Sequence, residues 1–332
     1  QSIWANAFGV SDRLEYFASS NTFKNSDLTK QEATEDLVLK SLRTFWETYV
    51  AQSQLKDAIS ARQMYKDLVG VVQKRGRFGL EKGGEYAQVM ADVTNSESQV
   101  KNASYVYLEK LKNLEILIQE PFNEDLEFTI QELVPPLPKL DELNRDQLRR
   151  LQLAKSNLEN ARMREQATTW RNEPSLDVIA RSTSTGVDGR ANAAYAEFIS
   201  GTKPTYYVGF ELSAPLDSSE ARANVALAHL QHEREKINSK RTSQDVETRL
   251  QLLRRRLEQT YLSASGALEI EKFRARTVKE QEAEYRSGRL SLRELLDTYR
   301  RFFDSQSQRV RAIGDYHIAL NEMAAERDEL VK

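Results

Sequence analysis

Two of the three histidines in this sequence, His229 and His232, are three residues apart. On an α-helix this spacing places both imidazoles on one face, and Glu233 follows directly. Two imidazoles and a carboxylate are common zinc ligands, so this group could hold a metal ion. No fourth ligand is evident, and the surrounding segment is charged throughout. We therefore expect a solvated helix face here and no metal site.

Acidic side chains offer a second kind of chemistry, because pairs of carboxylates can act as a general acid and base. With 50 acidic residues in the chain, such pairs are expected without any catalytic role. The sequence contains no phosphate-binding loop, nucleophile elbow or metal motif. It has no cysteine, which excludes disulfides, thiolate metal sites and cysteine nucleophiles. We predict that the protein is not an enzyme, with no catalytic residues and no cofactor.

The charge of the chain is abundant and balanced. Charged residues make up 30% of the 332 residues, yet the formal net charge is only −2. This composition is typical of long solvated helices that carry ion pairs four residues apart. A nucleic-acid partner is not expected, because it would require a basic excess. No apolar run approaches the ~18 residues of a membrane-spanning helix.

Apolar residues spaced three and four apart predict very long helices. One helix is predicted from about residue 11 to 73 and, beyond the glycine-rich stretch 76–84, a second that ends near residue 118. A longer helix is predicted over residues 219–286, about 105 Å at 1.5 Å per residue. A return helix follows Gly288, and heptad-like spacing in both arms predicts an antiparallel coiled-coil hairpin.

The sequence repeats itself at a nearly constant distance. Three landmarks recur at offsets of 212, 212 and 211 residues: Thr48-Tyr49 and Thr260-Tyr261, the five-residue stretches that begin at Gly76 and Gly288, and Tyr105 and Tyr316. A duplicated unit of this length predicts two structural halves related by pseudo-symmetry. In each half a glycine turn joins two long helices, which is typical of a tube-building or scaffold protein.

After residue 118 the composition of the sequence changes. Residues 119–144 hold four prolines and predict a linker, and a helix is predicted from about residue 141 to 171. Residues 175–185 and 205–214 are rich in Ser, Thr, Tyr and Val, and the second run alternates with period two, so both are predicted strands. Residues 186–203 between them are expected to form a long loop. Strands of this length fit a membrane β-hairpin, but the strands alone favour a small soluble hairpin on a helical protein.

The order of these segments resembles that of the TolC-like outer membrane efflux proteins, the outer membrane factors. Residues 207–217, YVGFELSAPLD, resemble the family's strand that runs into a Pro-Leu helix start. Residues 284–297, EYRSGRLSLRELLD, resemble its tyrosine-x-x-glycine turn at the periplasmic tip. Residues 137–161 resemble its inter-repeat segment. The resemblance covers nearly the whole chain.

This resemblance implies a mainly α fold in which two pseudo-repeats of long antiparallel coiled-coil α-hairpins carry a β-hairpin that contributes to a trimeric membrane β-barrel. The expected divisions are a first repeat at 1–118, an inter-repeat linker at 119–144, and a second repeat at 145–332 with its β-hairpin at 175–214 and its turn at 288. The implied partners are two further copies of the chain, outer membrane lipid, a periplasmic adaptor (membrane fusion) protein and an inner-membrane transporter. The implied location is the outer membrane and periplasm of a Gram-negative bacterium.

The resemblance also implies site residues. Tyr285, Glu294 and Asp297 are similar to the residues that gate the family's tunnel. Leu290 stands where a partner arginine is found in the best-known pattern, so that latching contact is not expected here. The two turns imply a surface that contacts the adaptor, formed by Gly76, Arg77, Phe78, Leu80, Gly288, Arg289, Leu290 and Leu292.

The sequence departs from the family pattern at its start. Shifting the second strand back by 212 residues places its counterpart at or before Gln1, so the opening helix and β-hairpin of the first repeat are expected to be missing, apart from a strand end at residues 1–4. Two explanations are open: the removal of about 100 N-terminal residues, which we favour, or a member of the family that has lost half of its barrel. The implied function is an outer membrane channel that exports substrates as part of a tripartite efflux or type I secretion system. The alternatives are a periplasmic scaffold that keeps the tunnel helices without a complete barrel, and an unrelated intracellular coiled-coil protein.

Overall fold

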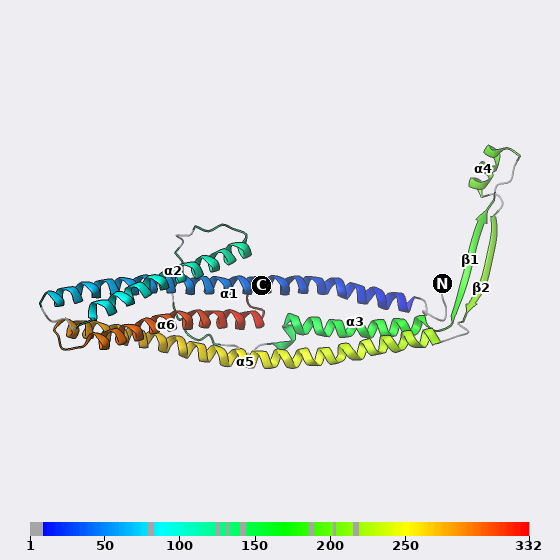
Figure 1. Cartoon of the computed structure of the whole chain (residues 1–332). Helices are drawn as coiled ribbons and strands as arrows, with labels where there is room; N and C mark the ends of the chain where they lie inside the picture. Colours follow the sequence, from blue (N-terminus) through cyan, green and yellow to red (C-terminus); the bar gives the residue numbers. More distant parts are fainter. Residues whose placement is uncertain are drawn as a thin grey trace. The chain divides into compact units, whose positions relative to one another are not determined.

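The computed structural model describes residues 9–78, 83–123, 127–130, 133–139, 144–185, 189–201, 204–214 and 219–331. Most of them are helical (Figure 1). In chain order the elements are α1 (Val10–Arg77), α2 (Glu85–Ile118), the short 3₁₀ helix η1 (Arg145–Gln147), α3 (Arg149–Arg171), β1 (Ser175–Ser184), α4 (Ala191–Ser200), β2 (Pro204–Ser213), α5 (Ser219–Arg286) and α6 (Leu292–Glu326). Among these residues no helix has both the length and the apolar character needed to cross a membrane.

The long helices agree with the sequence pattern. Helices α1 and α5 are each 68 residues long, and their successors α2 and α6 have 34 and 35 residues. The predicted helix over residues 141–171 was wrong at its start, because α3 begins only at Arg149, after the single turn of η1. The predicted strand end at residues 1–4 lies outside the described residues.

The predicted loop 186–203 was wrong, because it contains the helix α4. Three glycines suggested a loop, but the ten residues ANAAYAEFIS between Gly189 and Gly201 include four alanines, the residue with the highest helix propensity. Gly201 ends the helix with φ 60°, a left-handed conformation that suits glycine.

Strands β1 and β2 form the predicted antiparallel hairpin, with Ser175 opposite Ser213 and Ser184 opposite Pro204 (Figure 1). Alternation along each strand gives the hairpin two different faces. One face is largely apolar and consists of Leu176, Val178, Ala180, Ser182, Tyr206, Val208, Phe210 and Leu212. The opposite face is mostly polar and consists of Ser175, Asp177, Ile179, Arg181, Thr183, Thr205, Tyr207, Gly209, Glu211 and Ser213.

The chain divides into two compact units. Unit 1 comprises Gln1–Gln31 and Asn144–Asp245, and unit 2 comprises Glu32–Leu143 and Val246–Lys332. In unit 1, α3 lies against the first part of α1, and Ala18 of α1 and Ala167 of α3 are both buried. Polar contacts support this packing: Arg171 pairs with Glu15 at 2.9 Å, and Asn160 donates to the hydroxyl of Thr22.

Unit 2 has its core where α1, α2, α5 and α6 pack together. The largest buried cluster consists of Tyr65, Leu68, Val72, Val89, Val93, Val278, Tyr285, Leu292, Leu295, Leu296 and Tyr299. A second cluster joins α5 to α6 around Tyr316, whose hydroxyl donates to the carbonyl of Pro135 at 2.8 Å. The described parts of the linker therefore pack against the helices of unit 2.

Helix α6 also contacts α1 directly. The ring of His317 stacks on Trp46 with centroids 3.7 Å apart. Farther along, the carboxylate of Glu322 accepts hydrogen bonds from Arg43 of α1 and Arg256 of α5. The side chain of Glu322 is almost fully buried, so this carboxylate ties three helices together.

Candidate functional site at the helix turns of unit 2

The end of α1 and the start of α2 lie at the same end of unit 2 as the end of α5 and the start of α6 (Figure 1). Tyr285, near the end of α5, contacts residues of both α1 and α2. Its side chain is 1% exposed, and the guanidinium of Arg75 lies 4.3 Å above the centre of its ring. Arg75 also donates to the carbonyl oxygen of Tyr285 at 2.7 Å, and the Tyr285 hydroxyl lies 3.4 Å from the carboxylate of Glu85 on α2.

The α5–α6 turn has well-defined backbone geometry on both sides. Gly288 has φ 78°, and the backbone amides of Gly288 and Arg289 donate to the carbonyls of Tyr285 and Glu284. This is the Schellman pattern that ends a helix at glycine. Ser291 then begins α6 with a capping box, in which its hydroxyl accepts from the amide of Glu294 and the Glu294 carboxylate accepts from the amide of Ser291.

The first glycine turn differs from the second. The sequence equates Gly76 with Gly288, but Gly76 lies inside α1, which continues to Arg77. The glycine-rich stretch 76–84 does separate α1 from α2, as predicted, but Gly76 itself is not the turn residue. The left-handed glycine of this connection is Gly84, with φ 92° at the start of α2. A single glycine costs only about 1 kcal/mol within a helix, which the tertiary packing of α1 can offset.

The predicted adaptor-contact residues fall into two groups. Arg77, Phe78, Gly288 and Arg289 lie on the surface, and the Phe78 side chain is 80% exposed. Leu290 is half-buried against the core, and Leu292 is only 2% exposed within it. Leu80 lies outside the described residues. The exposed side chains among the predicted contact residues are therefore two arginines and one phenylalanine.

The predicted gate residues do not share one surface within the chain. Tyr285 is buried, whereas Glu294 and Asp297 are exposed on α6. The carboxylate of Glu294 turns back to the amide and hydroxyl of Ser291, at 3.1 and 2.7 Å. Asp297 lies 3.6 Å from Arg300, one turn farther along the helix.

A buried charge cluster, which the sequence did not reveal, lies deeper in unit 2. Arg309 of α6 lies 3.6 Å from Asp57 of α1 and 3.3 Å from Glu271 of α5. Burial raises the pKa of Asp57 to about 6; Arg309 opposes this shift and Glu271 adds to it. A polar cavity of about 630 Å³ beside Asp57 is lined by α1, α2 and α6. Asp57 is more than 200 residues from both Glu271 and Arg309 in sequence, so only the fold brings it to them.

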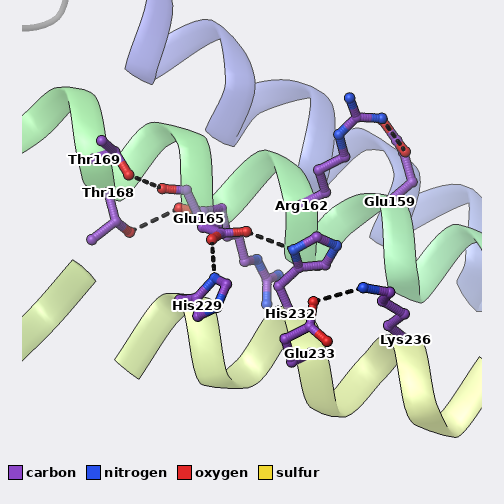
Figure 2. Close-up of polar contacts among 10 residues, drawn as sticks. Glu159, Arg162, Glu165, Thr168, Thr169, His229, His232, Glu233 and Lys236 are labelled. Carbon is purple, nitrogen blue, oxygen red and sulfur yellow. Dashed lines mark hydrogen bonds and ion pairs between the residues drawn. The ribbon is translucent and has the colours of Figure 1, made fainter. Parts of the chain in front are cut away.

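In unit 1 the two histidines have a partner that the sequence did not suggest. His229 and His232 of α5 both contact the carboxylate of Glu165 on α3 (Figure 2). The expected solvated face holds for His229, whose side chain is 59% exposed, but not for His232, at 21%. Glu233 points instead to Lys236, at 2.8 Å.

The start of α6 is marked in the sequence by a helix-capping motif that was overlooked. The sequence S-L-R-E at residues 291–294 has the capping-box spacing, and it fixes where α6 begins. Arg75 and Glu85 gave no such signal, because their contacts with Tyr285 span 210 and 200 residues of sequence.

No family model matches the chain, and neither does any curated protein. Solved structures do match it. The CmeC outer membrane channel of Campylobacter jejuni is 16% identical with a TM-score of 0.80, over 97% of this chain and 68% of that one. The open-state MtrE outer membrane channel of Neisseria gonorrhoeae is 14% identical with a TM-score of 0.79, over 98% and 73%. The outer membrane protein VceC of Vibrio cholerae is 13% identical with a TM-score of 0.71, over 96% and 76%.

At identities this low, the likeness establishes the fold. The TolC-like fold predicted from the sequence is confirmed: each match covers almost all of this chain, the long helices and the β-hairpin included.

Proposed function

We propose that this chain forms part of an outer membrane channel that exports substrates across the periplasm and outer membrane in a tripartite efflux or type I secretion system. The observation that carries the proposal is the two-faced β-hairpin, which is attached to long antiparallel helices in a fold shared with outer membrane channels. The hairpin would enter the membrane and the helices would build the tunnel.

The hairpin needs neighbours to be stable. A two-stranded ribbon is marginally stable at best in water, and here the large side chains Tyr206, Val208, Phe210 and Leu212 are all exposed on its apolar face. A membrane barrel places such a face against lipid and the polar face toward the lumen. We propose that a homotrimer brings the hairpins of its three copies together in one membrane barrel.

Exposed apolar side chains on the helices of unit 2 support the same assembly. On α5 they are Leu252, Leu262, Ile270 and Phe273, and on α2 they include Tyr105 and Ile116. Apolar surface of this kind is common where proteins associate. Side-by-side packing of three symmetric copies would bury it.

The face of the hairpin that meets lipid is testable by charge. Phe210→Arg places a cation on the apolar face, where it should cost about 2–4 kcal/mol if the residue lies near the bilayer midplane. We expect most of the variant to be absent from the detergent-extracted trimer fraction. The matched control is Glu211→Arg, the next residue on the opposite face, which should assemble normally.

Equal behaviour of the two hairpin variants would contradict the membrane orientation. Extraction of the unchanged protein without detergent would favour the alternative function, a periplasmic scaffold without a complete barrel.

We propose that the exposed turn surface formed by Arg77, Phe78 and Arg289 contacts a periplasmic adaptor, which links the channel to an inner-membrane transporter. Phe78 is the natural anchor, since a large aromatic side chain in a partner pocket often dominates interface energy. A photo-reactive residue at position 78 should cross-link to a co-expressed adaptor, and a probe at the exposed Tyr105 on α2 should not. Cross-linking from position 105 and none from position 78 would show that the adaptor contacts another surface.

We propose that Glu294 and Asp297 restrict the tunnel near this end. In a trimer they would bring six carboxylates toward one axis, and rings of acids bind cations in narrow pores. Because Glu294 also caps α6, the informative variant is Glu294→Gln with Asp297→Asn. Glutamine can keep the capping interaction while the charge is lost.

The neutral double variant should show a higher single-channel conductance and a severalfold weaker block by divalent cations. The control is Glu284→Gln, which removes an exposed acid at the same turn from α5. Unchanged conductance and unchanged block in the double variant would assign both acids to a solvated helix face.

A further inference from the structure

A cavity of about 630 Å³ lies between α1, α2 and α6 in unit 2. Its volume is within the range of about 300–1,000 Å³ that is typical of small-molecule pockets. Small and aromatic side chains, among them Ala61, Tyr65 and Phe303, form the apolar part of its wall. Asp57 of α1 and Asp92 of α2 also line it, and their side chains are 21% and 16% exposed. The cavity therefore combines apolar surface with two largely covered carboxylates.

Each of these two carboxylates shares an arginine with a second acid. Arg309 lies 3.6 Å from Asp57 and also pairs with an acid of α5. Arg300 lies 3.6 Å from Asp92 and 3.6 Å from Asp297. Because two acids share one cation in each cluster, one negative charge is left over at each place.

The hydrogen bonding of both carboxylates is incomplete. Oδ2 of Asp57 and Oδ2 of Asp92 are buried, and neither accepts a hydrogen bond from the residues that the structure describes. The arginine contacts at 3.6 Å are too long to be hydrogen bonds. A carboxylate can exchange its two oxygens by rotating about its last bond. Both groups can therefore accept hydrogen bonds from a molecule in the cavity.

The two acidic clusters are separated along α6. Arg300 and Arg309 are nine residues apart in this helix, which is about 13–14 Å at 1.5 Å per residue. One amine is too small to meet both clusters. Between the two arginines on the same helix, Phe303 has its ring centre 5.5 Å from that of Tyr65. Burial and the charge of Asp92 raise the pKa of Tyr65 to about 12, so the negative field reaches this aromatic wall.

We propose that the cavity binds a linear polyamine, a flexible chain of methylene groups with a protonated amine at each end. One terminal amine would pair with Asp57 and the other with Asp92, so that two positive charges balance the two negative charges left over. Protonated amines only donate hydrogen bonds, which complements carboxylate acceptors. The methylene chain would lie against the apolar wall, where Tyr65 and Phe303 can also hold a cation over their rings. This binding does not depend on the proposed channel function.

An anion or a compact metal ion fits the cavity less well. Arg300 and Arg311 also line it, but both are exposed, and Arg300 already pairs with two acids. The more deeply covered charges of the wall are the carboxylates of Asp57 and Asp92. They belong to separate clusters, whereas a metal ion needs its ligands close together.

The test is a calorimetric titration of the untagged full chain, in a mild nonionic detergent, with two diamines. Diaminodecane and putrescine carry the same two charges, but only the longer molecule can span the two acidic clusters. We expect diaminodecane to bind at one equivalent per chain and at least about tenfold more tightly than putrescine, because its second amine binds at a high effective concentration. Spermine should compete with it. Equal affinity of the two diamines would contradict binding across the cavity.

Substitutions that remove a charge and keep the shape locate the site. Asp57→Asn and Asp92→Asn should each weaken diaminodecane binding at least about tenfold, since hydrogen bonds between charged partners are the strong ones. The matched controls are Asp67→Asn on α1 and Glu97→Gln on α2, which remove exposed acids outside the cavity. Both controls should bind as the unchanged chain does. Far-UV circular dichroism checks that each variant keeps its helices.

The affinity should also depend on pH. Burial raises the pKa of Asp57 to about 6; Arg309 of α6 opposes this shift and Glu271 of α5 adds to it. A diamine binds the ionised carboxylate, so its affinity should rise about tenfold between pH 5 and pH 7. The rise should disappear in Asp57→Asn.

Two results would overturn the proposal. The first is that diaminodecane does not bind saturably. The second is that the variants Asp57→Asn and Asp92→Asn bind it no more weakly than the two controls do, which would assign the binding to dispersed acids on the helix surfaces.

Discussion

Tyr285→Ala is expected to lower the free energy of unfolding of unit 2 by about 3–5 kcal/mol, the usual cost of removing a buried aromatic side chain. Tyr285 is fully buried where α1, α2, α5 and α6 meet. The substitution leaves a cavity, removes the ring beneath the Arg75 guanidinium and deprives Glu85 of a partner. Urea unfolding followed by circular dichroism measures the global loss. Hydrogen exchange over residues 280–300 should rise most.

Two further substitutions separate the loss of the buried ring from the loss of the hydroxyl contact. Tyr285→Phe keeps the ring and loses only the hydroxyl contact with Glu85, so it should cost about 1 kcal/mol. Phe78→Ala removes a similarly large side chain from an exposed position just after α1, where substitutions usually stay within about 0.5 kcal/mol. If Tyr285→Ala costs no more than Phe78→Ala, the packing of this end does not depend on Tyr285. A gating movement of Tyr285 would have to break the same contacts.

Arg309→Met is the second substitution with a large expected effect. Arg309 is the shared partner of Asp57 and Glu271, and all three side chains are about four-fifths covered. Removing one partner of a buried charge cluster typically costs about 3–5 kcal/mol, because the remaining charges are left uncompensated. The free energy of unfolding at pH 7, from urea titration, measures it.

The acidity of Asp57 gives this prediction a pH dependence. Its folded pKa of about 6 lies above the ordinary value of 3.8. The protonated form is therefore favoured in the folded state, and this contribution is lost as pH rises through about 6. Without Arg309 the pKa should rise further, so Arg309→Met should be less harmful at pH 5 than at pH 7.

Neighbouring variants serve as controls for Arg309. Arg311→Met, an exposed arginine two residues away, should change stability by less than about 0.5 kcal/mol. Adding Asp57→Asn to Arg309→Met should restore part of the lost stability, since one uncompensated acid is removed. Equal effects of Arg309→Met and Arg311→Met, or no recovery in the double variant, would argue against the charge cluster.

The elements with regular periodicity could be predicted from sequence. Spacings of three and four defined α5 and α6, Gly288 located their turn, and period two along residues 205–214 located β2. These signals are local, because they depend on which side of one helix or strand is buried. The likeness of residues 284–297 to an efflux-channel turn then gave the correct fold.

The errors arose where two local signals competed. At residues 186–203 the glycines outweighed a short alanine-rich run, and α4 was missed. At Gly76 the match to Gly288 suggested a turn, but the surrounding residues of α1 pack well enough to keep the helix intact. Leu292 was predicted to contact the adaptor because it lies close to the Gly288 turn, yet its side chain is buried in the core of unit 2.

The sites depend on contacts that no local pattern contains. The spacing of His229 and His232 was visible, but Glu165 lies 64 and 67 residues before them, so nothing marked it as their partner. The same holds for Arg309, whose partner Asp57 belongs to the opposite end of the chain. Partners of this kind become visible only when the helices are placed side by side.

The pairing of α6 with α1 constrains how the protein is made. Arg43 and Glu322 are 279 residues apart in sequence, and Trp46 meets its ring partner at His317. At a synthesis rate of about 5–20 residues per second, Glu322 is synthesised roughly 14–56 s after Arg43. Throughout that interval the apolar side of α1 lacks the last helix that covers it. Contacts this distant also form slowly, because a long loop must close first. The packing around α1 in unit 2 therefore cannot be completed until α6 has been synthesised.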